Sequence, residues 1–278
     1  MGLSLNKMNI AFFGAGKWGK NYIPILESLG ANIRIGNRNN WRDILQDNWA
    51  THVIIATPPE NHIEIALVAL KKNLPIMVEK PIALTSQEVL NLMEYESNTP
   101  VLVNYIHLFS PAFQKMYDML KNEEIIKINS MGCNRGPFRN YSSLFDYAPH
   151  DLSMGMYLAG DLNFDKFCCH AKDENGGTNY NIKAYYGDIK HNIFIGNGSK
   201  EKKRYLEVIC ESNNKYVYDD LSINKLVVNK EPVEISKTKP LENSIGYFLE
   251  FISTGKVKPI WDLKFSLDIT KYLEMISI

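Results

Sequence analysis

Three glycines with the spacing G-x-G-x-x-G follow a short apolar run near the start of the chain. They are Gly14, Gly16 and Gly19, after the run at residues 10–13. In a strand–turn–helix unit, the first glycine permits a tight turn and the second lets the backbone approach a pyrophosphate. The third lets the helix pack close to the strand, and the start of that helix directs unpaired N–H groups at the phosphates. We therefore expect a dinucleotide site here, with Lys17 and Trp18 in the same loop.

A histidine and an aspartate four residues apart form a second group that could do chemistry. His150 is a candidate proton shuttle because the unperturbed pKa of an imidazole lies near neutrality. Asp146 would share a helix face with it and orient the ring. Two structural alternatives remain open. Pro149 fits best in the first turn of a helix, so a helix starting near residue 147 would make Asp146 its N-cap. His150 could equally be a buried structural histidine.

The segment Glu79-Lys80-Pro81 closes a buried apolar strand. Partial desolvation at such a position favours the neutral amine of a lysine. Hydride transfer at a carbinol carbon needs a group that moves the hydroxyl proton and a donor that polarises the oxygen. Lys80 and His150 are the candidates for these two tasks. The alternative for Lys80 is a surface lysine paired with Glu79, which could instead contact a ribose.

Strands and helices alternate through the first half of the chain. Apolar strands are expected at residues 10–13, 32–35, 52–56, 75–78 and 101–104, with helices between them. This alternation predicts a doubly wound parallel sheet that binds its ligand at the carboxyl edge of the strands. Thr57, Glu79, Lys80 and Asn104 fall at that edge. Thr57 and Pro58 open a loop in which His62 would cap the next helix close to the cofactor.

The loop after the second expected strand bears on the choice of cofactor. An acidic residue in this loop selects NAD by binding the adenosine ribose. No Asp or Glu occurs between Glu27 and Asp43, and the loop offers Asn37 and Arg38 instead. An arginine suits a 2′-phosphate, so the sequence favours NADP over NAD. The alternative is that Arg38 is an ordinary surface arginine.

The pattern changes after residue 122. Strands are expected at 125–133, 164–171, 179–187, 190–196, 204–211 and 215–219, with helices at 147–159, 241–253 and 263–276. Short turns between successive strands predict a mostly antiparallel open sheet in an α+β domain. We therefore divide the chain into a dinucleotide-binding Rossmann domain, residues 1–121, and a substrate and oligomerisation domain, residues 122–278.

Composition excludes several classes of partner. The 278 residues are 45% apolar, which is enough for two domains, and 31 basic residues balance 31 acidic ones. This balance gives no electrostatic reason to expect nucleic acid or a membrane as partner, and no apolar run is long enough to span one. The four cysteines lack metal-binding spacing and indicate reduced thiols in the cytoplasm, so no metal is expected.

Several motifs together resemble one family of oxidoreductases. They are GAGKWG at 14–19, ATPPENH at 56–62, EKP at 79–81, NYIHLFSPAF at 104–113 and DYAPH at 146–150. The chain resembles the family that groups glucose–fructose oxidoreductase, inositol dehydrogenase and the rhizopine-catabolism proteins (Gfo/Idh/MocA). The WGKN run at 18–21 looks most like members in nucleotide-sugar pathways. The resemblance implies nicotinamide-dependent oxidation or reduction of a sugar, sugar nucleotide or related polyol.

The resemblance also implies roles for single residues. Lys80 would contact the substrate oxygen, and Asp146 and His150 would complete the catalytic set. The residues expected to bind the cofactor are Gly14, Gly16, Lys17, Trp18, Gly19, Asn37, Arg38, Thr57, Pro58, His62, Glu79 and Lys80. Two departures from the family are visible. The segment between the second and third strands is short, and Asn104-Tyr105 stands where relatives often carry a glycine and an aromatic residue.

The resemblance leaves two other functions open and implies self-association. A glycosidase of the same fold would use NAD for a transient oxidation, and a regulator would bind the dinucleotide without catalysis. The open sheet of the family often mediates dimers or tetramers. Apolar positions at Ile193, Ile195, Val208 and Ile209 would form a face that needs cover. Arg135 and Arg139 would be surface residues or would hold an anionic part of the substrate.

Overall fold

The computed structural model describes residues 8–95, 99–160, 166–254 and 262–277. The chain forms two compact units, Met1–Asn104 with Ser244–Thr270 and Tyr105–Asn243 with Lys271–Ile278. This grouping differs from the division expected at residue 122. Residues 105–121 join the second unit because the helix at Pro111–Leu120 packs on strands of that unit. Part of the C-terminal region joins the first unit, where Phe248 contacts His52. The separate roles of the two domains remain a prediction.

The first unit contains the expected parallel sheet. Its strand order is β2-β1-β3-β4-β5, and all neighbouring strands run parallel. Their bounds are β1 Asn9–Phe13, β2 Asn32–Gly36, β3 His52–Ile55, β4 Ile76–Glu79 and β5 Val101–Asn104. The apolar residues of the four strands other than β2 are buried, as expected for strands covered on both faces. The edge strand β2 is the most exposed of the five.

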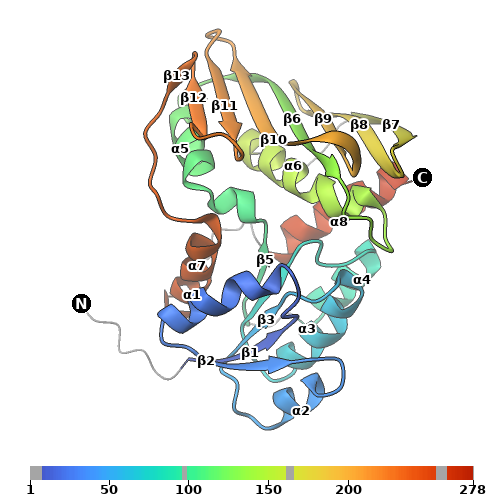
Figure 1. Ribbon diagram of the computed structural model, residues 1–278, viewed down its shortest axis with the longest axis vertical. Helices are drawn as coiled ribbons and strands as arrows, with labels where there is room; N and C mark the ends of the chain where they lie inside the picture. The colour runs from blue at the N-terminus through green and yellow to red at the C-terminus, as the bar shows by residue number, and fades with distance from the viewer. Residues whose placement is uncertain (1–7, 96–98, 161–165, 255–261, 278) are drawn as a thin grey trace. The chain divides into compact units, whose positions relative to one another are not determined.

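Helices cover both sides of this sheet (Figure 1). Their bounds are α1 Tyr22–Ser28, α2 Trp41–Gln46, α3 His62–Leu70 and α4 Ser86–Met93. Helix α4 begins with a capping box, in which Thr85 and Glu88 satisfy each other's backbone N–H groups. Strand β1 has β2 on one side and β3 on the other, so the direction of winding reverses at this point. Ligands of doubly wound sheets bind at the carboxyl ends of strands at such a reversal.

The second unit contains an eight-stranded sheet with the order β13-β12-β11-β10-β6-β9-β8-β7. Its pairs are antiparallel except for β6 and β9, which confirms the mostly antiparallel sheet. The bounds are β6 Ile125–Arg135, β7 Lys166–Glu174, β8 Gly177–Tyr186, β9 Ile189–Gly196, β10 Gly198–Cys210, β11 Lys215–Asp219, β12 Leu226–Val228 and β13 Glu231–Pro232. The two last strands were not expected because they are too short to show alternation.

One long helix, α6 Ser143–Ala159, packs on the inner face of this sheet against β6, β8 and β9 (Figure 1). Ile193 and Ile195 lie on β9 and are buried, and Val208 on β10 is buried as well. These three side chains therefore need no second copy to cover them, so the expected open apolar face is wrong at these positions. The remaining helices are α5 Pro111–Leu120, α7 Pro240–Thr254 and α8 Leu263–Ser277.

The outer face of the sheet carries polar side chains in its centre. The side-chain amide of Asn192 donates to Asn129 across 2.8 Å, and that of Asn129 donates to Glu207 across 2.9 Å. These residues occupy neighbouring strands in register. The alternation along β6 and β9 thus buries one set of side chains under α6 and leaves a hydrogen-bonded set on the other face.

Helix α6 begins four residues earlier than expected. The hydroxyl of Ser142 accepts from the backbone N–H of Leu144 and caps the helix. Pro149 therefore lies inside the helix, where its missing N–H leaves the carbonyl of Phe145 without its usual donor. Asp146 lies inside the helix as well, so the alternative that made it the N-cap is wrong.

Two further properties of the described residues concern membrane crossing and the cysteines. Among the described residues, no helix combines the length and apolarity that crossing a membrane would need. All four cysteines are free thiols: Cys133 and Cys210 are buried, Cys169 is half-buried and Cys168 is exposed.

A buried carboxyl group lies between α6 and the sheet. Asp151 on α6 is 1% exposed. It hydrogen-bonds Ser130 on β6 and is attracted by the charge of Arg204 on β10. Burial raises the pKa of Asp151 from its ordinary value near 3.8 to about 6, against the opposing effects of Arg204 and Ser130. The folded protein therefore binds this proton more tightly than the unfolded chain.

The raised pKa of Asp151 predicts that the free energy of unfolding depends on pH. A group with a raised pKa in the folded state stabilises the fold fully below about pH 4, and this contribution is lost as the pH rises through about 6. A shift of about two units corresponds to about 2 to 3 kcal/mol. Urea denaturation of Asp151→Asn between pH 4 and 8 should lack this pH-dependent term. The exposed Asp188→Asn serves as control, and an unchanged pH dependence in Asp151→Asn would contradict the prediction.

Candidate active site

The glycine-rich loop packs directly on the end of β3. Gly14 has a φ of +102°, and a Cβ at this position would overlap the backbone of Ala56 and Thr57. A Cβ on Gly19 would overlap the carbonyl oxygen of Gly14. Glycine is therefore required at both positions by the fold itself. The loop is held at the carboxyl ends of β1 and β3, the point where the winding of the sheet reverses.

Gly16 differs from the other two glycines. A Cβ at Gly16 would meet no atom within 4 Å, and its φ lies outside the left-handed region. Both Gly16 and the neighbouring Lys17 are exposed. The fold gives no reason for a glycine here, whereas a ligand that lies against the backbone would. The loop therefore fits the pyrophosphate of a dinucleotide.

The carboxylate of Glu79 joins three segments of the first unit. Its Oε1 atom accepts from the indole N–H of Trp18 across 2.7 Å and from the amide of Asn104 across 2.9 Å. The hydroxyl of Tyr22 donates to the same oxygen and accepts from Asn104. Burial, and then the charge of Glu79, raises the pKa of Tyr22, so this hydroxyl keeps its proton. Glu79 is thus bound by the glycine-rich loop, α1 and β5.

Sequence reasoning did not find this cluster. It expected Glu79 to pair with Lys80 or a ribose, and it expected Trp18 to contact the cofactor. The indole N–H of Trp18 instead holds Glu79, while the residue remains 42% exposed beside the glycines. The sequence signal that could have indicated this cluster is the hydroxyl of Tyr22, a polar group on the otherwise apolar face of α1.

His62 fixes the other end of the Glu79-Lys80-Pro81 segment. Its Nδ1 lies 2.9 Å from the carbonyl oxygen of Pro81, and its Nε2 lies 2.8 Å from that of Thr57. The ring is buried, and burial lowers the pKa of His62 in spite of these carbonyl oxygens. The histidine expected to cap a helix beside the cofactor therefore joins the loops that follow β3 and β4. Lys80, half-buried, lies between the anchored Glu79 and Pro81.

Two buried oxygen atoms at the carboxyl edge of the sheet have no hydrogen-bond partner within the described parts of the chain. They are Thr57 Oγ1, after β3, and Asn104 Oδ1, at the end of β5. Buried polar atoms are nearly always satisfied in native proteins. These two fit a bound polar group at the edge where sequence reasoning expected the ligand. Pro58, in the same loop, is exposed.

The loop after β2 contains the residues expected near the adenosine ribose. The side-chain oxygen of Asn37 accepts from the backbone N–H of Asn39 across 2.8 Å, so it shapes the turn. Arg38 is exposed and makes no side-chain hydrogen bond or ion pair with any residue that the structure describes. Its guanidinium is available to an anionic ligand.

The second unit carries the other two expected catalytic residues. Asp146 and His150 lie one turn apart on α6 and are each 8% exposed. The guanidinium of Arg139 donates to Asp146 Oδ2 across 2.7 Å and lies over the ring of Tyr141. Arg139 is therefore an anchor for Asp146 rather than an isolated surface residue. Arg135 is exposed.

His107 was not expected to take part in any cluster, but it packs against His150. The two ring centroids lie 4.7 Å apart. The two residues are separated by 43 positions, and no spacing rule relates them.

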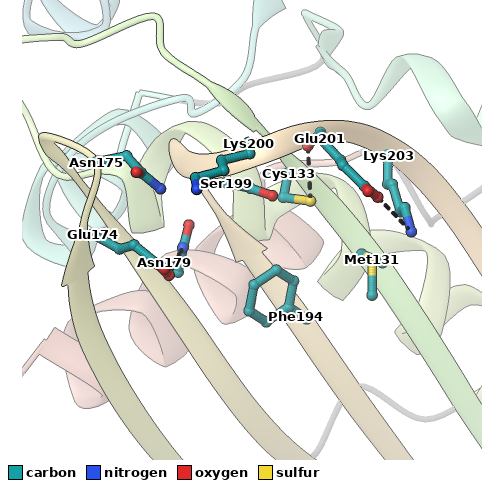
Figure 2. Close-up of a pocket in the computed structure, with 10 residues that line it drawn as sticks. All are labelled: Met131, Cys133, Glu174, Asn175, Asn179, Phe194, Ser199, Lys200, Glu201 and Lys203. Carbon is teal, nitrogen blue, oxygen red and sulfur yellow. Dashed lines mark hydrogen bonds and ion pairs between the residues drawn. The ribbon is translucent and has the colours of Figure 1, made fainter.

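A surface pocket of about 350 Å³ lies on the second unit, away from these residues (Figure 2). Figure 2 shows Phe194, Met131 and the Lys203–Glu201 ion pair among the residues that line it. None of the expected catalytic or cofactor-binding residues lines it. Within the described ranges, no cluster of His, Cys, Asp or Glu could hold a metal ion.

Known proteins are similar to this chain in fold and in part of its sequence. The family model described as an oxidoreductase family with an NAD-binding Rossmann fold matches residues 26–107. Inositol 2-dehydrogenase 2 of Saccharopolyspora erythraea is 25% identical over 183 residues, which are 55% of this chain and 54% of that protein. A solved structure from Magnetospirillum magnetotacticum MS-1 has a TM-score of 0.85 and 25% identity, covering 96% of this chain and 99% of the other.

A UDP-N-acetylglucosamine 3-dehydrogenase from Acidithiobacillus ferrooxidans has the same fold, with a TM-score of 0.82 at 15% identity. The alignment covers 97% of this chain and 96% of the other. In sequence, the chain spans about half the length of two curated relatives that it matches. The segment matched by the family model contains Lys80, and the structural likeness extends over both units. The chain is therefore similar to the Gfo/Idh/MocA family of oxidoreductases in sequence and in fold.

Proposed function

We propose that this protein is an NAD(P)-dependent oxidoreductase. It transfers a hydride between a nicotinamide and the hydroxyl or keto carbon of a sugar, a sugar nucleotide or a related polyol. The match to the model of an oxidoreductase family with an NAD-binding Rossmann fold supports the reaction class. The substrate class follows from relatives whose names give inositol and UDP-N-acetylglucosamine as substrates.

The observation that carries this proposal is the arrangement of Gly16 and Lys80 in one unit. The loop at Gly16 is open where a pyrophosphate would bind, although the fold does not require glycine there. Lys80 follows β4 of the same sheet, and its neighbours Glu79 and Pro81 are both held by buried hydrogen bonds. A dinucleotide site and a rigidly mounted lysine at one sheet edge fit a dehydrogenase better than a protein that only senses the dinucleotide.

Residues of the first unit would hold the nicotinamide cofactor. The backbone of the glycine-rich loop would bind its pyrophosphate, and Thr57 and Asn104 would supply their buried oxygen atoms to its polar groups. Arg38 would bind a 2′-phosphate, so we favour NADP over NAD. When bound, the cofactor supplies the hydride acceptor or donor.

The remaining chemistry belongs to the side chains of the chain. Lys80 donates a hydrogen bond to the substrate oxygen and stabilises the charge that develops on it. His150 takes up or returns the hydroxyl proton, because an imidazole serves both directions near neutral pH. Asp146 orients the imidazole, and Arg139 holds the carboxylate of Asp146 in place.

We also propose that the protein acts in the cytoplasm as a homodimer or homotetramer through the sheet of the second unit. The family resemblance supports self-association through this sheet. The half-buried Phe194 and Met131 on its outer face supply apolar area for such a contact.

The first prediction separates cofactor binding from folding. Gly16→Val places a side chain where the pyrophosphate would lie, and its Cβ would meet no protein atom within 4 Å. Binding of NADH and NADPH, measured by fluorescence, should weaken more than about tenfold. The melting temperature should hardly change, because surface substitutions away from special features usually cost less than about 0.5 kcal/mol.

Gly14→Val is the matched contrast. It combines a positive φ with overlap on Ala56, so it should destabilise the fold itself. A folded Gly16→Val protein that binds both dinucleotides normally would remove the proposed cofactor site.

The second prediction concerns the 2′-phosphate. Arg38→Asp replaces an exposed cation with an anion, so the Kd for NADPH should rise by about tenfold or more while the Kd for NADH changes little. Asn39→Asp adds a negative charge to the same loop while keeping Arg38, and it therefore reports the effect of charge alone. Equal losses for the two cofactors in Arg38→Asp would show that Arg38 does not select NADP.

The third prediction separates the roles of Lys80 and His150. Turnover is measured with a panel of UDP-sugars and inositols by following NADPH or NADH absorbance. Lys80→Ala and His150→Asn should each lower kcat on the order of a hundredfold while dinucleotide binding survives. His150→Asn should also erase a limb of the pH profile near neutrality, whereas Asp146→Asn should displace that limb.

The exposed residues Lys183 and His170 provide matched controls as Lys183→Ala and His170→Asn. Near-normal turnover of His150→Asn would mean that His150 is a structural histidine. Lys80 would then remain as the single candidate for contact with the substrate oxygen.

A further inference from the structure

His107 and His150 form a packed pair of imidazole rings inside the second unit. His107 lies in the 3₁₀ helix Ile106–Phe109, and His150 lies in α6. The ring planes meet at 84° with centroids 4.7 Å apart, so the edge of one ring meets the face of the other. Both residues are buried. Aromatic pairs prefer this arrangement, and the contact restricts the rotation of each ring.

Strand β11 holds the other side of His107. The Nδ1 atom of His107 lies 2.9 Å from the hydroxyl of Tyr218, and Ser110 and Asp220 also hydrogen-bond this tyrosine. Burial, and then the charge of Asp220, raises the pKa of Tyr218, so the phenol keeps its proton at neutral pH. Tyr218 therefore restrains the His107 ring, which in turn packs against the His150 ring.

The short distance between the rings has an electrostatic consequence. Two imidazolium ions at this separation repel each other strongly in a buried site. A proton on one ring therefore opposes a proton on the other, and the two rings titrate as a coupled pair. Asp146, held by Arg139, lies one turn from His150 on α6. The charges of Asp220 and Arg204 act on Tyr218, which contacts His107.

We propose that His107 is a positioning residue for His150. It sets the plane of the His150 ring and allows only one of the two rings to be charged at a time. The proposal rests on the proposed function, in which His150 moves the proton of the substrate hydroxyl. Protonation of His107 would lower the proton affinity of His150 and so favour release of its proton, while His107 itself makes no bond to the substrate.

The first test follows protons directly and needs neither substrate nor cofactor. The ¹⁵N signals of the His150 imidazole are titrated in the full-length protein, and they are assigned from their loss in His150→Asn. His107→Phe keeps an aromatic ring in contact but removes the second ionisable group. The midpoint of His150 should rise by about one pH unit in this variant. An unchanged midpoint would overturn the proposal.

If His107→Phe does not fold, the titration curve of His150 in the wild-type protein provides a second test of the proposal. Two coupled rings each report the titration of the other, so the His150 signal should show two steps that coincide with those of His107. A single independent step for each ring would also overturn the proposal.

The kinetic test uses two tyrosines of the same strand. Tyr218→Phe removes the hydroxyl that holds His107, so kcat should fall about tenfold while KM is unchanged. Tyr216→Phe is the matched control, because its hydroxyl donates to Glu123 across 3.0 Å and has no part in the pair. Equal kcat values for Tyr218→Phe and Tyr216→Phe would overturn the positioning role. Coupled titration together with full turnover of His150→Asn would instead reject the proposed role of His150 in catalysis.

Discussion

The buried carboxylate of Glu79 is the interaction on which the arrangement of the first unit depends. A carboxylate removed from water is costly unless donors replace the lost hydration. Glu79 receives donors from Trp18, Tyr22 and Asn104, which belong to the glycine-rich loop, to α1 and to the end of β5. Loss of any one donor leaves a buried charge less well satisfied, so the three segments are held together. The loop that would carry a pyrophosphate and the strand that precedes Lys80 are positioned by the same oxygen atom.

A second constraint acts on the other side of Lys80. His62 lies within hydrogen-bond distance of the carbonyl oxygens of Thr57 and Pro81, which links the ends of β3 and β4. The backbone on both sides of Lys80 is thus fixed by buried polar contacts that reach neighbouring strands. A group that polarises a substrate oxygen needs such support, because it stabilises the developing charge only if it is already in the correct position before the reaction. Trp18, Glu79 and His62, which were expected to contact the cofactor, therefore hold the surrounding loops in place.

Periodicity and turn chemistry predicted most elements, since they act over a few neighbouring residues. Strand β5 has the expected bounds, and helices α1 to α4 lie between the strands as the alternation predicts. The start of α6 was missed because the cap at Ser142 outweighs the one hydrogen bond that Pro149 removes. The clusters around Glu79 and His150 join residues tens of positions apart, such as Trp18 with Glu79 and His107 with His150. Pattern rules describe neither pair, because only the folded sheet and helices bring these residues together.

Helix α6 carries two adjacent buried polar residues, Asp151 and His150, which contact different parts of the second unit. Asp151 meets Ser130 and the charge of Arg204, which belong to the central strands of the sheet. The next residue toward the N-terminus, His150, contacts His107 instead. Consecutive helical residues point about 100° apart, so the helix presents one to the sheet and the other to the 3₁₀ helix. The contacts of Asp151 help to hold the part of α6 that carries His150, and the packing of His107 acts on rotation of the imidazole about its own bonds. His107 restricts that rotation, so the sheet and the second histidine together determine where a proton on His150 can be placed.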